Sequence, residues 1–353
     1  MLLYIHIPFC DSKCSYCAFN SYVDKFSLKK EYMQALLVQF EAEFLRFGIS
    51  RDNPIETVFI GGGTPSTVEP ELYYPLFERI KPYLAPDAEI TSEANPNSAT
   101  RSWLEGMYEL GINRISFGVQ SFNNEKLKTL GRAHHTQHAL EAIRCASAIG
   151  YKHLSIDLIY GVRGDTKALL QADIDQAFSL PIDHISLYSL TIEEKTAFEN
   201  TPEIAEEELD LTRWLFRKIE EKGFEQYEIS NFGKYRSRHN IGYWEHKPYI
   251  GLGSGAVGFL NMQRFYPSQD VAHYVQNPIE YRIEALDAEA LLSESLFLGF
   301  RSRVGVDSAR LSAAQRQNAD ILCREGVLTY DGSRYFNTDF LLSDEIALRV
   351  EGF

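Results

Sequence analysis

The chain has 353 residues, of which 44% are hydrophobic and 24% charged, a balance typical of a globular protein with a sizeable core. Its formal net charge of -14 argues against a nucleic-acid partner and against a broad electrostatic attraction to anionic lipid. No apolar run is long enough for a transmembrane segment, and the first residues lack the features of a signal peptide, so we expect a cytoplasmic protein.

Apolar runs and helical patterns alternate through the first half of the chain. The run 2–7 predicts a buried strand that ends at Pro8, and Ser27 is expected to cap a helix that continues to about Phe47. Further strands are predicted at 57–60, 89–92, 114–118, 153–159 and 184–190, with helices at 70–84, 99–110, 124–130, 136–149 and 167–178. Because such alternation gives parallel strands with right-handed crossovers, we predict an incomplete, TIM-like (β/α)6 barrel over residues 1–230.

Residues 231–353 are assigned to a separate C-terminal domain. Helices are expected over 288–300 and 313–324, followed by a hairpin over 327–335 that turns at Asp331-Gly332. This order predicts a small α+β domain with a winged-helix-like outline. Its arginines are matched by acidic residues, so we do not expect it to bind nucleic acid.

Three cysteines follow the first predicted strand: Cys10, Cys14 and Cys17, at C-x3-C-x2-C spacing. Cysteine thiolates bind iron–sulfur clusters, and a cubane of four irons held by only three thiolates keeps one iron open. A zinc site that adds His6 is the alternative, but structural zinc usually draws its ligands from two separated pairs. A disulfide framework is disfavoured because the chain has an odd number of cysteines and no secretory signal. We therefore predict a [4Fe-4S] cluster.

Polar residues recur where the predicted strands end, which is the catalytic face of barrels of this kind. The segment Gly61-Gly62-Gly63 allows a ligand to approach the backbone closely. Glu93 and Asp157 are costly to bury unless ribose hydroxyls or an ammonium group satisfy them. Gln120 can bond a hydroxyl or an adenine edge, and Arg132 can bind a carboxylate through two bonds. Each is also compatible with a cap or salt bridge, but their common location predicts a binding site.

Other residues with reactive side chains are assigned structural roles. His134 and His135 are adjacent and precede a predicted helix, so they cannot face the same way; with His138 they are expected to serve in the loop and in capping rather than as metal ligands. Cys145 and Cys323 lie in apolar helical patterns and are expected in the core.

With these residues identified, the chain resembles the coproporphyrinogen-oxidase-like branch of the radical S-adenosylmethionine (SAM) proteins. The resemblance covers nearly the whole chain and includes the segments 4–10, 61–65, 92–96, 114–122, 130–134 and 157–161. Phe19 stands two residues after the third cysteine, where the oxidase has a further cysteine, and no room remains before Cys10 for the oxidase's N-terminal extension. Both features resemble the heme-chaperone group of this branch, as does the motif His239-Asn240-Ile241-Gly242-Tyr243-Trp244.

This resemblance implies two sets of site residues. The first holds a [4Fe-4S] cluster on the three cysteines and SAM on the open iron, with SAM surrounded by Tyr4, Gly62, Gly63, Thr64, Glu93, Gln120, Arg132 and Asp157. The second gives His239, Tyr243 and Trp244 a role in binding heme, since imidazole is a common heme ligand and aromatic faces suit a macrocycle. A capped loop with two core aromatics is the alternative interpretation of that motif.

The implied function is a heme chaperone that delivers heme to recipient respiratory hemoproteins at the inner face of the membrane and that receives electrons from a donor. The superfamily's shared chemistry is the cleavage of SAM to a 5′-deoxyadenosyl radical. The resemblance leaves open whether this cleavage serves turnover or heme transfer, so we assign no dedicated enzymatic reaction. The alternative is an oxygen-independent coproporphyrinogen III oxidase or another enzyme that modifies tetrapyrroles by radical chemistry.

Overall fold

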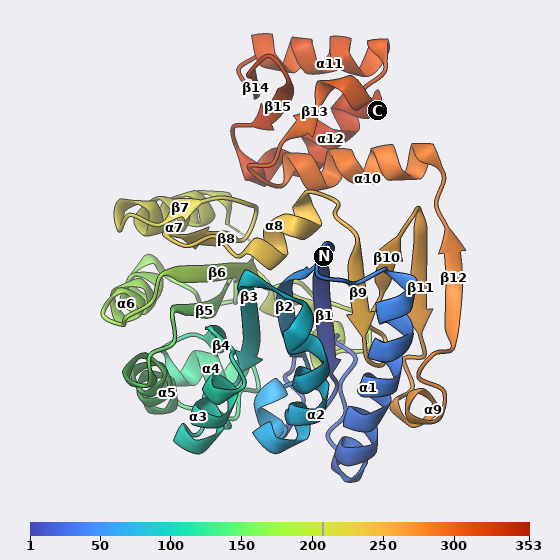
Figure 1. The fold of residues 1–353 in the computed structure, drawn as a ribbon. Helices are drawn as coiled ribbons and strands as arrows, with labels where there is room; N and C mark the ends of the chain where they lie inside the picture. The colour runs from blue at the N-terminus through green and yellow to red at the C-terminus, as the bar shows by residue number, and fades with distance from the viewer. Residues whose placement is uncertain (207) are drawn as a thin grey trace.

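The computed structural model describes residues 1–206 and 208–353. A sheet of twelve strands forms the main body, in the order β12-β11-β10-β9-β1-β2-β3-β4-β5-β6-β8-β7 (Figure 1). Neighbouring strands pair in parallel from the first to the sixth: β1 (Leu2–Ile7), β2 (Ile55–Gly62), β3 (Leu84–Ala94), β4 (Arg114–Gln120), β5 (His153–Tyr160) and β6 (His184–Ser189). The predicted incomplete (β/α)6 barrel is confirmed.

Six helices in the connections pack on the outer face of these strands (Figure 1): α1 (Lys29–Arg46), α2 (Pro70–Ile80), α3 (Arg101–Glu109), α4 (Asn124–Thr129), α5 (Thr136–Ile149) and α6 (Lys167–Phe178). Along β1, Leu3, Ile5 and Ile7 belong to the main core cluster, so the alternate residues face the barrel interior. Capping of the first helix by Ser27 is wrong. A 3-10 turn, Phe26–Leu28, precedes α1, and Leu28 occupies the N-cap without a side-chain bond.

The sheet continues past residue 230, where the domain boundary is predicted. After α7 (Leu209–Glu221), β8 (Asn231–Gly233) pairs with β6, and β7 (Glu225–Gln226) forms one edge. β9 (Tyr249–Leu252) pairs in parallel with β1. Three antiparallel strands and a short helix complete the other edge: β10 (Gly258–Leu260), β11 (Gln263–Pro267), α9 (Val271–Gln276) and β12 (Tyr281–Ala285).

The last segment folds around its own apolar cluster. It contains α10 (Ala288–Phe300), β13 (Val306–Asp307), α11 (Ala313–Arg324), β14 (Leu328–Tyr330), β15 (Arg334–Asn337) and α12 (Ser343–Glu351), with a separate sheet in the order β13-β15-β14. α8 (Arg238–Trp244) lies between the barrel and this domain (Figure 1). Over the described part of the chain, we find no helix with the length and apolar character needed to cross a bilayer.

Candidate functional site

The three-cysteine loop follows β1 directly and is anchored at its far end. Cys10 is buried, Cys14 and Cys17 are half-buried, and all three are free thiols. The Cys10 N–H donates to the Tyr22 carbonyl at 3.1 Å, which closes the loop. Asn20 Nδ2 donates to two backbone carbonyls of the turns after β9 and β11, at 3.1 and 2.9 Å. The loop is therefore held at the carboxyl ends of the parallel strands.

A chain of hydrogen bonds connects two of the three sulfur atoms. Thr64 Oγ1 donates to Cys10 Sγ at 3.3 Å, and Asn95 Nδ2 donates to Thr64 Oγ1 at 3.2 Å. Asn95 Oδ1 accepts from Arg132 Nη2 at 2.6 Å, and Arg132 Nη1 donates to Cys14 Sγ at 3.3 Å. Burial raises the pKa of the Cys10 thiol, and the hydrogen bond from Thr64 opposes this rise. That bond therefore offsets part of the cost of forming the thiolate, which is the form that binds iron.

The glycine segment packs against the cysteine loop too closely for a side chain. Gly62 has a φ of +111°, and its N–H donates to Glu93 Oε2 at 3.1 Å. A Cβ added at Gly63 would lie 3.1 Å from Cys10 Sγ and 2.9 Å from each of two backbone carbonyl oxygens. The close backbone approach expected at this segment is therefore present beside the sulfur.

Glu93 and Asp157 lie near each other inside the rim. Ser116 Oγ donates to Asp157 Oδ1 at 3.1 Å. Burial and the neighbouring Asp157 raise the pKa of Glu93 to about 8, and burial also raises the pKa of Asp157. Carboxyl groups that resist ionisation in this way are frequent at functional sites. A ligand that brings an ammonium or hydroxyl groups would stabilise the charged forms.

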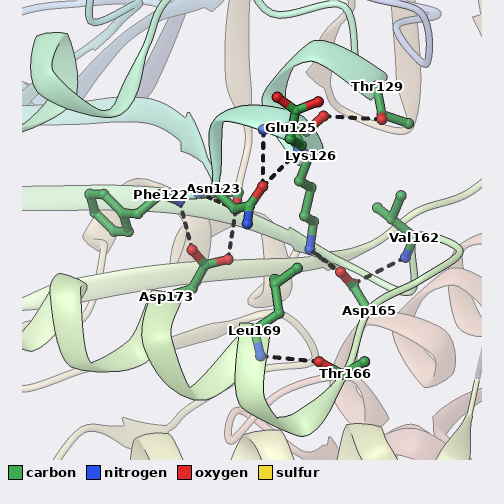
Figure 2. A network of polar contacts seen from close by, with 11 residues as sticks. Phe122, Asn123, Glu125, Lys126, Thr129, Val162, Asp165, Thr166, Leu169 and Asp173 are labelled. Atoms are coloured by element: carbon green, nitrogen blue, oxygen red, sulfur yellow. Dashed lines mark hydrogen bonds and ion pairs between the residues drawn. The ribbon is translucent and has the colours of Figure 1, made fainter.

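Gln120 ends β4 in a left-handed conformation, with a φ of +66°, which is uncommon for a residue with a side chain. The pairing of β4 with β5 also shifts register there. The turn that follows is fixed to the next connection (Figure 2): the Phe122 N–H donates to Asp173 Oδ1 at 2.7 Å, and Lys126 Nζ contacts both oxygens of Asp165 at 2.7 and 2.9 Å. The Lys126 and Asp165 side chains are only 3% and 4% exposed, so this ion pair is screened little by water.

Arg132 uses both of its Nη atoms within the protein. In addition to Cys14 and Asn95, it donates to the Gly118 carbonyl at 2.7 Å. Its Nε is buried and has no hydrogen-bond partner among the described residues. A buried guanidinium N–H without an acceptor, next to three thiols, fits the carboxylate-bearing ligand that the sequence analysis expects there.

Tyr4 lies deeper in the barrel than the glycine segment. Its hydroxyl bonds His6 Nδ1 at 3.1 Å, and its ring stacks on Phe59 with ring centroids 6.3 Å apart. It also lines a cavity of about 340 Å³ to which His239 and Tyr243 contribute. Tyr4 is thus part of the barrel interior on the side of β1 that faces α8.

The alternative zinc site lacks its proposed fourth ligand. His6 Nδ1 bonds the Tyr4 hydroxyl, and His6 Nε2 bonds the Asn20 carbonyl at 2.8 Å. Within residues 1–206 and 208–353, no three Cys, His, Asp or Glu side chains converge on one metal ion. This includes Cys10, Cys14 and Cys17, so the cluster remains a prediction from the C-x3-C-x2-C spacing, which supplies the three thiolates expected for a cluster with an open iron.

The histidines near residue 135 have the structural roles predicted for them. His135 is the N-cap of α5 and forms a capping box with His138. His134 Nε2 bonds the Val119 carbonyl at 3.0 Å, and burial together with Arg132 lowers the pKa of His134 to about 3.

The three residues with an expected heme role do not share one cavity. His239 is 1% exposed, and its ring nitrogens bond Thr57 Oγ1 at 2.7 Å and the Tyr243 hydroxyl at 3.2 Å. Burial lowers the pKa of His239 to about 3. Trp244 instead lines a different cavity, toward the C-terminal domain. In this conformation His239 could ligate iron only by giving up one of its two bonds.

Sequence reasoning assigns no role to Asn95 or Glu89, although both organise the site. Asn95 connects Thr64 with Arg132. It follows β3 directly, on the same rim as the cysteines, and this position in the sequence could have identified it as a site residue. Glu89 accepts the His239 N–H at 3.0 Å from 150 residues away in the chain. No local pattern could have indicated such a contact.

Comparison with known proteins gives the family. A model of the Radical SAM superfamily matches residues 4–177. The chain is 35% identical over 335 residues to the heme chaperone HemW of Bacillus subtilis, covering 90% of this chain and 87% of that protein. It is 33% identical over 370 residues to the heme chaperone HemW of Mycobacterium tuberculosis, covering 99% and 94%. Coproporphyrinogen III oxidase (HemN) from Escherichia coli, a radical SAM enzyme, shares the fold with a TM-score of 0.83 at 20% identity, covering 99% of this chain and 90% of that chain.

The parallel barrel, the three-cysteine loop and the glycine segment together define a radical SAM protein. The chain belongs to the radical SAM superfamily and groups there with the proteins named heme chaperone HemW.

Proposed function

We propose that this protein is a heme chaperone that carries a [4Fe-4S] cluster and SAM at the barrel rim, binds heme and delivers it to heme-accepting proteins. The observation that carries the proposal is the similarity to proteins named heme chaperone HemW over 90% and 99% of the chain. Supporting it, the three thiols and the polar rim lie together at one end of the barrel.

In this proposal the rim residues hold the two cofactors. Cys10, Cys14 and Cys17 bind the cluster, while Thr64 and Arg132 donate hydrogen bonds to two of the sulfurs and so influence its reduction potential. When bound, the cluster supplies an electron and an open iron for SAM. The remaining rim residues orient SAM: the Gly62 to Thr64 backbone, Glu93, Gln120 and Asp157, with Tyr4 deeper in the barrel.

The proposed recipients are respiratory hemoproteins at the inner face of the membrane, and a cytoplasmic electron donor reduces the cluster. No dedicated turnover is proposed. The support for these points is the family resemblance and the names of the relatives.

The test is anaerobic reconstitution followed by hemin titration under reducing conditions. We expect iron and sulfide in near-equal amounts, a shift of the heme absorbance on binding, and transfer of heme to an added apo-cytochrome. Cys17→Ala is the matched variant without a cluster. If reconstituted protein causes no heme absorbance shift, the proposal is wrong.

A radical enzyme that modifies tetrapyrroles is the second candidate, favoured by the fold shared with HemN over 99% of the chain. Anaerobic incubation with SAM, reductant and coproporphyrinogen III, followed by mass spectrometry, separates the two. A decarboxylated product would support the enzyme, whereas an unchanged porphyrin together with heme transfer would support the chaperone.

A further inference from the structure

A cavity of about 580 Å³ lies between α8 and the C-terminal domain. Figure 1 shows α8 in this position, beneath α10. The residues that matter here are Trp244, His246, Lys247, Arg303, Arg310 and Arg334. The volume is in the usual range of about 300–1,000 Å³ for sites that hold small molecules and cofactors.

The cavity carries positive charge that the protein does not neutralise. The whole chain has 49 acidic and 35 basic residues, yet the lining contains four arginines and one lysine against two carboxylates. One arginine and the lysine have carboxylate partners. Arg303, Arg310 and Arg334 form no salt bridge with any residue that the structure describes. Guanidinium groups in this state favour an anion with planar oxygen pairs, such as a carboxylate.

One of these arginines is fixed in place without losing its charge. Arg334 Nε and Nη2 donate to the carbonyls of Val304 and Gly305 at 2.8 and 3.0 Å. Arg310 makes no hydrogen bond to the described residues and is exposed, so its guanidinium is available at the mouth of the cavity.

The α8 side of the cavity offers a flat apolar surface. Trp244 lines it together with Ile241. The indole Nε1 of Trp244 is buried and has no hydrogen-bond partner among the described residues. Buried indole N–H groups are normally paired, so this side chain lacks an acceptor that a ligand can provide.

His246 supplies an imidazole whose orientation is fixed. Its backbone has a φ of +58°, an uncommon conformation outside glycine. The ring stacks on Phe259 with centroids 5.0 Å apart and planes 6° apart. Nε2 lies 3.2 Å from Glu294 Oε2, and Glu294 Oε1 accepts from Arg264 Nη2 at 2.6 Å. Glu294 Oε2 has no hydrogen-bond partner among the described residues, so this is a charge contact rather than a hydrogen bond. A carboxylate beside the second ring nitrogen is typical of a histidine that ligates a metal.

We propose that this cavity is the heme site, an assignment that rests on the proposed function. Arg303, Arg310 and Arg334 bind the propionate carboxylates. Trp244 packs along the macrocycle, and His246 ligates the iron through Nδ1, which no described residue bonds. The assignment places heme at the amino ends of the parallel strands, away from the cysteine loop, and replaces His239 with His246 as the ligand.

The first test measures carboxylate recognition with full-length, reconstituted protein. We expect Arg310→Ala to weaken hemin binding about tenfold, and Arg303→Ala with Arg310→Ala to weaken it further, because each removes a charge-assisted bond. Arg316→Ala, an exposed arginine on α11, is the control and should bind as wild type does. Hemin dimethyl ester, whose carboxylates are masked, should bind wild type and the double variant equally. Hemin affinity unchanged in both arginine variants would overturn the assignment.

The second test identifies the iron ligand. His246→Ala should shift the Soret band of the bound ferric heme and lower its affinity, whereas His273→Ala, an exposed histidine on α9, should change neither. An unchanged heme spectrum in His246→Ala overturns the ligand assignment. The assignment is also overturned if His239→Ala folds but loses the Soret band while His246→Ala keeps it. If wild type binds no hemin, the proposed function fails; if it binds hemin and the cavity variants match it, only the location fails.

Discussion

The two ends of the parallel strands are organised in different ways. At the carboxyl ends, Thr64, Asn95 and Arg132 are already bonded to each other and to two sulfurs. At the amino ends, α8 is anchored on β2 and β3, and three arginines of the cavity beyond it have no carboxylate partner in the part of the chain that the structure describes. β1 pairs with β2 over six residues, from Leu2 and Thr57 to Ile7 and Gly62, so the two ends are separated by roughly 16 Å of strand.

This difference indicates two kinds of binding site. A site whose polar groups bond one another before any ligand arrives loses little conformational entropy on binding and holds its ligand in one geometry. A site with uncompensated charge and an unpaired N–H relies on the ligand for neutralisation. The second arrangement suits a cargo that is taken up and released, and the first suits cofactors that stay.

The largest effect is expected from removing a cluster ligand. Cys10→Ala or Cys14→Ala should reduce the iron and sulfide content of reconstituted protein to near zero, because each cysteine supplies a ligand that nothing else at the rim replaces. Hemin affinity should change less than about twofold, because the proposed heme site lies at the other end of the strands. Cys145→Ala, which is outside the rim, should retain the cluster. Loss of hemin binding together with the cluster would show that the two ends are coupled.

Glu89 is expected to show the largest effect on folding at the opposite end. It accepts from the Tyr235 hydroxyl at 2.7 Å and from the N–H groups of Arg238 and His239 at 2.8 and 3.0 Å, close to Arg114, which is 2% exposed. Glu89→Ala leaves two helix N–H groups without their acceptor and removes the negative charge near the buried Arg114 guanidinium. The free energy of unfolding should fall by about 3–5 kcal/mol, measured by urea denaturation.

The pH dependence and a surface control test the cause of this loss. Burial opposes ionisation of Glu89, but Arg114 and the hydrogen bonds outweigh it and lower the pKa of Glu89. Its stabilisation is therefore present above the unfolded pKa of a carboxyl and is lost as the pH falls through the lower, folded value. Glu105→Ala removes an exposed ion pair with Arg101 and should cost less than about 1 kcal/mol. An equal loss in both variants would contradict the buried-charge explanation.

Many helices of the barrel and of the last segment could be predicted because their signals are local. The bounds of α5, α6, α10 and α11 match the prediction, and each of these helices has a polar N-cap residue in the sequence. The strands between residues 225 and 285 were not predicted. They have two to five residues each, which is too short for a periodic pattern to identify them, and β8 and β9 join the sheet through strands far along the chain.

The features of the candidate sites also differ in whether the sequence predicts them. The cysteines and the glycine segment are short motifs that follow strands, so their common location was predictable. The engagement of Arg132 with Cys14 depends on how two loops 118 residues apart pack together. The cationic cavity joins residues from α8, from the segment before β13 and from β15, and the overall negative charge of the chain conceals it.

Asn95 offers a smaller test of the preassembled rim. Asn95→Ala removes the acceptor of Arg132 and the donor to Thr64, so both side chains should become mobile beside the sulfurs. We expect SAM to bind about tenfold more weakly, which corresponds to about 1.4 kcal/mol, measured by the change that SAM causes in the electron paramagnetic resonance spectrum of the reduced cluster. Asn97→Ala, with no hydrogen bond from that side chain among the described residues, is the matched control. Unchanged SAM affinity would show that the rim does not depend on this link.

Glu93→Gln should have no effect on stability at low pH and a modest effect at high pH. Burial and Asp157 raise the pKa of Glu93 from an ordinary 4.5 to about 8 in the folded protein. Between these values the unfolded chain releases a proton that the folded protein keeps, so wild type loses stability as the pH rises, and the loss is complete above pH 8. Glutamine still accepts the Gly62 N–H but avoids this cost.

The variant and wild type should therefore unfold alike at pH 4. At pH 9 the variant should be more stable by about 1–2 kcal/mol. This difference in unfolding free energy is smaller than the full pKa shift of Glu93 would give, because Glu93 is partly exposed and water screens its charge. Melting temperatures across this range, with Glu105→Gln as the control, measure the difference. A difference that does not grow with pH would mean that Glu93 is ionised in the folded protein. With saturating SAM, wild type should become the more stable of the two proteins at pH 9. A ligand ammonium or hydroxyl group stabilises the carboxylate of Glu93 and binds the amide of Glu93→Gln more weakly.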